Sequence, residues 1–130
     1  LFDGIRELLC DLRTAGKRLA IASSKNERLV RKALAETGID GLFDAVVAAH
    51  DPTHVGKEHL VADSLAALGC AAADAVMVGD RFYDIEGARA NDVASLGVYL
   101  ADTAKPGELE RAGATACVSS VADMRRVLLG

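Results

Sequence analysis

The stretch VMVGDRFYDIEGARA, from Val76 to Ala90, decides the fold of this chain. It begins as a short apolar run, which predicts a buried strand, and it continues as an amphipathic run, which predicts a helix. Gly79 and Asp80 stand at the junction, and Asp84 follows one helical turn later. Two carboxylates held side by side repel each other unless a positive charge lies between them. The stretch therefore predicts a strand that leads into a helix, with a cation between the two acids.

Length and composition bound the class of protein. A chain of 130 residues is enough for one domain, and we expect residues 1–130 to form a single domain. It is 51% hydrophobic and 26% charged, which is typical of a soluble globular protein. The net charge of −4 argues against a nucleic-acid partner, because such surfaces concentrate Lys and Arg. Because the first residue is not Met, we expect this domain to be the C-terminal part of a longer parent.

Cysteine usage and hydropathy bear on the compartment. Cys10, Cys70 and Cys117 lie far apart and form no Cys-x-x-Cys pair. An odd, scattered set predicts buried, reduced thiols and a cytoplasmic protein. No apolar run approaches the roughly 18 residues that a membrane helix needs, so we expect no membrane partner.

Helical spacing of apolar residues alternates along the chain with short apolar runs. This alternation predicts an α/β fold of the three-layer, doubly wound type, with a parallel sheet between two layers of helices. In such sheets ligands bind beyond the carboxyl ends of the strands, so the residues after each strand are the candidates for chemistry. The predicted helices are 5–15, 27–37, 57–68, 84–91, 108–112 and 121–129, and the predicted strands are 18–22, 45–48, 75–78, 94–99 and 115–118.

Two serines follow the first predicted strand. Hydroxyls and free backbone N–H groups at a strand-to-helix turn can hold an anion, which makes Ser23 and Ser24 candidate phosphate-binding residues. The alternative is helix capping. Asn26 or a neighbouring serine would accept a hydrogen bond from the first turn, and Glu27 would favour the positive end of the helix dipole. Both interpretations stay open from the residues alone.

Lys57 stands at the start of the third predicted helix, after an irregular segment. A lysine in the first turn opposes the helix dipole and is favoured there only beside an anionic partner. The alternative is a solvated surface lysine. The segment before it holds His50 and His54 with Asp51 between them, but Pro52 and Gly56 break the helical register that would align the two histidines, and no third ligand is suitably spaced. We therefore predict no zinc site there.

Asp80 and Asp84 are candidate metal ligands. Either could serve only as a helix N-cap. Two acids at the end of a strand, with small residues behind them, fit a hard cation with oxygen ligands, of which Mg²⁺ is the foremost candidate. Such an ion would offset their repulsion and bridge to a phosphate.

Taken together, these segments resemble the haloacid dehalogenase (HAD) superfamily of phosphohydrolases, and most closely its phosphoglycolate-phosphatase-like branch. The resemblance lies in Ser23 after a strand, in Gly56-Lys57, and in GDRFYD (79–84) with the following IEGARAN (85–91), and it covers nearly the whole chain. It implies a HAD-like Rossmannoid core. It also implies that Ser23 binds phosphate, that Lys57 neutralises it, and that Asp80 holds Mg²⁺ directly while Asp84 binds or supports the ion.

One motif of the family is absent from the sequence. The family's first motif, Asp-x-Asp-x-Thr/Val after an amino-terminal strand, supplies the nucleophile and a general acid/base. Phe2-Asp3-Gly4 resembles instead the turn at which the chain returns from the family's helical cap domain. The missing strand would be central, between the strands that end at Ala22 and Val78. Without it, those strands must pair directly, borrow a strand from another copy in a homo-oligomer, or keep exposed edges.

The resemblance implies Mg²⁺-dependent hydrolysis of a small phosphorylated metabolite by the parent protein. The chain alone is expected to be inactive, because Asp80 and Asp84 cannot attack phosphorus while they hold a metal. Three alternatives remain: a non-catalytic module that binds phosphate and Mg²⁺, a haloacid dehalogenase, and a receiver domain of the response-regulator type. A receiver needs a late lysine after a strand, which Lys105 supplies only loosely. The substrate is not fixed, because the family's cap domain shapes its pocket.

Overall fold

The computed structural model describes residues 2–49, 56–101 and 103–130. His50 and His54, where no zinc site is predicted, lie outside the described residues. The strands are β1 (Ala20–Asn26), β2 (Ala45–Ala49), β3 (Val76–Gly79), β4 (Ala94–Val98) and β5 (Ala116–Val118). The helices are α1 (Ile5–Thr14), α2 (Glu27–Glu36), α3 (Lys57–Leu68), α4 (Phe82–Ala90), α5 (Glu108–Ala112) and α6 (Val121–Leu129), with short 3-10 helices η1 (Asp40–Leu42) and η3 (Ala72–Asp74).

The predicted α/β class is confirmed, and two elements, β1 and α4, have a boundary that differs from the sequence prediction by two residues or more. β1 begins two residues later than predicted and continues to Asn26, because the Ser-Ser-Lys segment stays extended beside β2 with a register shift between Ser23 and Asn26. α4 begins at Phe82 rather than at Asp84, because the Asp84 side chain accepts the Arg81 backbone N–H and so caps an earlier start.

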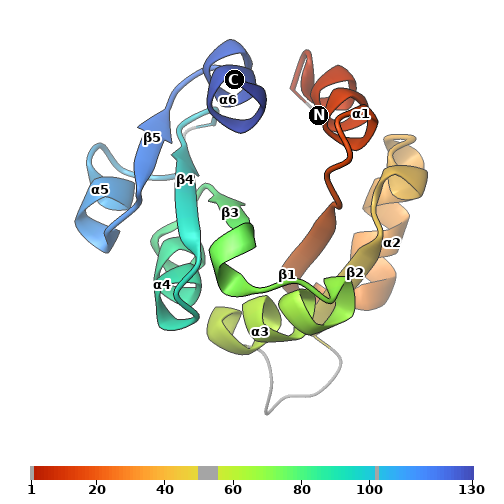
Figure 1. Cartoon of the computed structure of the whole chain (residues 1–130), viewed down its shortest axis with the longest axis horizontal. Coiled ribbons are helices and arrows are strands. Elements are labelled where there is room, and N and C mark those ends of the chain that lie inside the picture. Colours follow the sequence, from red (N-terminus) through yellow and green to blue (C-terminus); the bar gives the residue numbers. More distant parts are fainter. Residues whose placement is uncertain (1, 50–55, 102) are drawn as a thin grey trace.

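The parallel strands form two separate sheets. β1 pairs with β2, and β3, β4 and β5 form a second sheet in that order. Figure 1 shows β1 and β3 on opposite sides of the centre of the molecule. The structure therefore does not show direct pairing of β1 with β3, which was the first of the expected ways to close the sheet.

Helices cover the strands on two faces. Leu96 and Val98 of β4 pack with Leu8 and Leu12 of α1 and with Met124 of α6. On the other face, the apolar side chains of α3, α4 and α5 form two clusters against β3, β4 and β5. α2 packs on β1 and β2 beside α1. Three layers result, as predicted.

One face of β3 lacks this cover. Met77 packs against the cluster from α3 and α4, and its neighbours Val76 and Val78 point to the opposite face because side chains alternate along a strand. Val76 is 54% exposed and Val78 is 37% exposed. Apolar residues in the middle of a domain are seldom this exposed, so β3 offers an uncovered face and an unpaired edge toward β1.

None of the described helices is both long enough and apolar enough to cross a membrane. The three cysteines are unpaired, as predicted. The prediction that they are buried was wrong, because Cys10 is exposed and Cys70 and Cys117 are only partly buried. Leu8 and Leu12 face the core from α1, and a residue midway between them on a helix points away from it.

Candidate functional site

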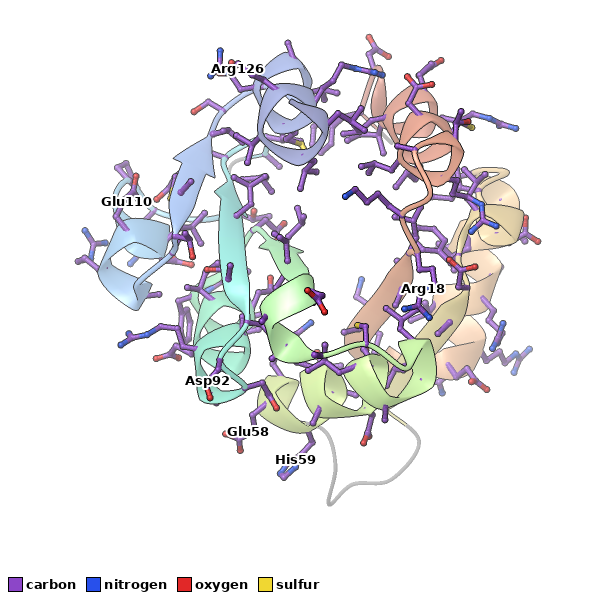
Figure 2. All side chains as sticks on the ribbon, in the orientation of Figure 1. Arg18, Glu58, His59, Asp92, Glu110 and Arg126 are labelled. Atoms are coloured by element: carbon purple, nitrogen blue, oxygen red, sulfur yellow. The ribbon has the colours of Figure 1, made fainter. Side chains whose placement is uncertain are left out.

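All five predicted site residues line one open groove of about 430 Å³ between β1 and β3. Ser23 and Ser24 come from β1, Lys57 from the start of α3, and Asp80 and Asp84 from the β3–α4 turn. Figure 2 shows the centre of the molecule open with the side chains drawn, while labelled charged residues such as Glu58, Glu110 and Arg126 lie on the outer rim. The carboxyl ends of the strands therefore gather these side chains, as expected for parallel sheets.

Lys57 connects the two sheets through buried contacts. Its Nζ lies 2.9 Å from Asp84 Oδ1 and donates to the Ala22 carbonyl oxygen at 2.8 Å. The side chains of Lys57 and Asp84 are only 9% and 8% exposed. The anionic partner that the position of Lys57 requires is therefore Asp84, and the alternative of a solvated surface lysine is wrong. The ammonium has a third N–H that can be offered to a ligand.

Asp84 has most of its hydrogen-bonding capacity engaged. Its Oδ2 accepts the backbone N–H groups of Asp80 and Arg81, each at 3.2 Å, and its Oδ1 meets Lys57. The N–H of Arg81 is the N-cap donor of α4, so Asp84 does contribute to capping. Such a carboxylate shapes the turn and can support a cation at most through one remaining lone pair or through water.

Gly79 allows Asp84 to fold back onto the end of β3. A Cβ at Gly79 would lie 2.3 Å from Asp84 Cβ and 2.8 Å from its Cγ. Gly87 serves the same site from α4, because a Cβ there would lie 2.8 Å from Lys57 Cγ. These two glycines permit the close approach that forms the buried ion pair.

We expect Gly79→Ala to lower the free energy of unfolding by about 1–3 kcal/mol, because the new methyl group must displace Asp84 or the strand. Urea denaturation measures the effect. Gly41→Ala is the matched control: no atom lies within 4 Å of a Cβ there, and its φ lies outside the positive range that strains other residues. Equal effects of the two substitutions would contradict the role given to Gly79.

Asp80 is the carboxylate best placed to bind a cation. It is half-buried, its Oδ2 accepts a hydrogen bond from Thr103 Oγ1 at 3.2 Å, and its Oδ1 faces no hydrogen-bond partner among the described residues. The described residues hold no cluster of three or more acidic, His or Cys side chains that could chelate an ion. Mg²⁺ commonly binds through one or two carboxylates and keeps several waters, so this donor set fits Mg²⁺.

The serines at the end of β1 are free of helix capping. Asn26 Oδ1 accepts the Leu29 N–H at 3.3 Å and so caps α2, which confirms the capping interpretation for Asn26. Ser23 Oγ accepts the Lys25 N–H at 3.2 Å, which leaves its own O–H as a donor. The hydroxyl of Ser23 can therefore donate to an anion in the groove.

Glu108 was missed by the sequence analysis. Its Oε2 accepts Arg81 Nε at 3.1 Å and the Phe82 N–H at 3.0 Å, and its Oε1 accepts the Lys105 N–H at 3.3 Å. Burial raises the pKa of this carboxyl, but the hydrogen bonds from Arg81, Lys105 and Phe82 outweigh burial and hold the pKa below its usual range. An acid at the start of a helix is common as a dipole partner, so its position alone did not single it out.

Tyr83 is a second residue that sequence reasoning passed over. Its ring lines the groove, and Lys57 Nζ lies 5.9 Å from the ring centroid. Arg81 lies 5.4 Å from the same ring. The ring therefore lies within cation–π range of two positive side chains beside the site.

The fold and the groove define a parallel α/β protein whose strand ends gather hydroxyls, a lysine and two carboxylates, an arrangement suited to phosphate and a divalent cation. The chain belongs to the haloacid dehalogenase-like hydrolase family, whose sequence profile matches residues 1–98. The predicted resemblance is thus confirmed. Membership of this family decides against the receiver alternative.

Several proteins are similar to this chain. The tyrosine-protein kinase PtkA of Mycobacterium tuberculosis is 45% identical over 94 residues, covering 72% of this chain and 32% of that protein. The phosphoglycolate phosphatase of Caulobacter vibrioides is 32% identical over 129 residues, covering 98% and 54%. A crystal structure of a predicted phosphatase from Clostridium acetobutylicum superposes with a TM-score of 0.91 at 33% identity, covering 98% and 59%. The chain therefore spans only 32% to 59% of the length of these relatives.

Proposed function

We propose that this chain supplies the phosphate-binding and metal-binding part of a Mg²⁺-dependent phosphomonoester hydrolase. The observation that carries the proposal is the convergence of Ser23, Ser24, Lys57, Asp80 and Asp84 on one groove from three separate segments. Serine hydroxyls and a lysine are donors to phosphate oxygens, and carboxylates are ligands of hard cations. The family's phosphatases support this chemistry.

Each side chain has a distinct part in the proposed site. Mg²⁺ held by Asp80 would neutralise charge on the phosphate. Ser23 donates its O–H to a phosphate oxygen, and Ser24 lies beside it at the same strand end. Lys57 offers its third N–H to the phosphate while Asp84 and the Ala22 carbonyl hold its ammonium in place. Positioning and charge neutralisation are the main contributions of a protein to phosphoryl transfer.

The nucleophile is proposed to lie outside these 130 residues, on a strand that would fit between β1 and β3. Support comes from the groove between the two sheets, from the exposed Val76 and Val78, and from the greater length of the relatives. The chain alone would then be inactive. A strand lent by a second copy would close the same gap in a homo-oligomer.

The substrate class is proposed to be a small phosphorylated metabolite, as the phosphoglycolate phosphatase relatives suggest. The similarity to PtkA, which is called a tyrosine kinase, shows that family membership alone does not fix the phosphoryl acceptor. The relatives that align with almost the whole of this chain are called phosphatases, which favours water as the acceptor of the phosphoryl group. A non-catalytic binding module and a dehalogenase are the alternatives. The unpaired cysteines support the proposal of a cytoplasmic protein.

We expect orthophosphate to bind this groove in the presence of Mg²⁺ and to shift the backbone amide resonances of Ser23, Ser24 and Asp80. Ser23→Ala should weaken binding about tenfold, because a hydrogen bond to a charged group is lost. Ser64→Ala is the control, since its hydroxyl donates to Leu60 within α3. Phosphate that binds equally well to wild type and Ser23→Ala would contradict the site, and absence of binding to wild type would contradict the function.

A further inference from the structure

Two segments of chain meet beside Asp80. One is the β3–α4 turn, which carries Asp80, and the other is the segment from β4 to α5, which begins after Val98. The second segment contacts the first at two places: Thr103 donates to Asp80 Oδ2, and Glu108 accepts from Arg81 and Phe82. The turn is therefore held from both of its sides, by Asp84 within α4 and by Glu108 from α5.

The geometry points to Glu108 as a positioning residue for the cation at Asp80, an inference that rests on the proposed function. Glu108 touches neither the groove nor the proposed ion directly. It acts on the turn, because it binds the guanidinium of Arg81 and the N–H of Phe82, the two residues that directly follow Asp80. A residue that fixes the backbone beside a ligand also fixes the direction in which that ligand's carboxylate points.

The burial of Glu108 makes this contact strong enough to matter. Its side chain is 13% exposed, whereas the Arg81 side chain is 35% exposed. The three hydrogen bonds that the Glu108 carboxylate accepts come from a guanidinium and two backbone N–H groups, which satisfy both of its oxygens. Charge-assisted hydrogen bonds are about twice as strong as neutral ones. Removing the charge of Glu108 therefore weakens the contacts that hold the β3–α4 turn in one conformation.

Glu110 offers a matched comparison on the same short helix. Its carboxylate accepts the Tyr99 O–H, away from the β3–α4 turn. In Figure 2 it lies on the outer rim of the molecule. Removing its charge disturbs the packing of α5 without any contact to Arg81 or Phe82.

The test is a titration of the 130-residue chain with Mg²⁺ alone, followed by the amide resonances of Asp80 and Arg81. We expect Glu108→Gln to weaken Mg²⁺ binding about tenfold or more, the range seen when a partner of a metal ligand is removed. Glu110→Gln should leave the Kd within about twofold of wild type, even where both variants lose similar thermal stability. A purely structural role would change the melting temperature of Glu108→Gln and leave its Mg²⁺ Kd unchanged, which would overturn the inference.

Three outcomes separate a failure of the inference from a failure of the proposed function. If Glu108→Gln does not fold, Arg81→Gln removes the same ion pair from the exposed side, and an unchanged Mg²⁺ Kd in that variant would overturn the inference. If wild type itself shows no Mg²⁺ response at Asp80, the metal site of the proposed function is wrong and the inference is overturned with it. If wild type and Glu108→Gln bind Mg²⁺ equally well, the inference about Glu108 is overturned and the proposed function is not.

Discussion

Asp84→Ala is expected to lower the free energy of unfolding by about 3–5 kcal/mol, the cost of removing one partner of a buried ion pair. The substitution leaves the Lys57 ammonium buried with the Ala22 carbonyl as its described partner. It also removes the acceptor of two backbone N–H groups in the β3–α4 turn. Because Lys57 connects β1 to α4, the loss weakens the contact between the two sheets.

Urea denaturation with a control on the surface measures this effect. Glu36→Ala removes an exposed pair with Lys32, whose Nζ lies 3.9 Å from Glu36 Oε1, and should cost at most about 0.5 kcal/mol. Lys57→Met should cost less in the Asp84→Ala background than in wild type, by about 0.5–3 kcal/mol of coupling. An Asp84→Ala variant as stable as Glu36→Ala would show that the pair does not join the sheets.

Much of the fold follows from local pattern in this chain. The alternation of helical spacing with short apolar runs is strong, and every predicted helix and strand exists. Their bounds lie within two residues of the prediction, except that β1 continues four residues further, to Asn26. The positions after the strands also follow, because parallel strands bring their carboxyl ends to one edge. This is why Ser23, Lys57 and Asp80, far apart in sequence, could be expected to meet in one groove.

What the sequence did not predict depends on contacts between distant segments. The anionic partner of Lys57 is Asp84 of the chain itself. The two residues can meet only because α3 and α4 approach each other closely at Gly87. Glu108 reaches Arg81 across 27 residues of sequence, and no local spacing connects the two. The sequence left open how the strands that end at Ala22 and Val78 meet, and the division into two sheets shows that they do not pair directly.

The second large effect concerns catalysis. In a longer gene product with an Asp-x-Asp motif upstream of Leu1, we expect Mg²⁺-dependent phosphatase activity. Asp80→Asn should lower this activity at least about 100-fold, because loss of a metal ligand should reduce activity at least as much as loss of a residue that orients such a ligand. In the 130-residue chain we expect no activity. Covalent catalysis on phosphorus needs a carboxylate aimed at it, and Asp84 is bound to Lys57 and to the turn while Asp80 is the proposed metal ligand.

The most direct measurement is the initial rate of p-nitrophenyl phosphate hydrolysis by the purified 130-residue chain, with and without Mg²⁺, beside its Asp80→Asn variant. We predict the same background rate for wild type and variant, with no response to Mg²⁺. Mg²⁺-dependent turnover by wild type that Asp80→Asn abolishes would contradict the central claim that this chain holds the phosphate and metal site without its nucleophile.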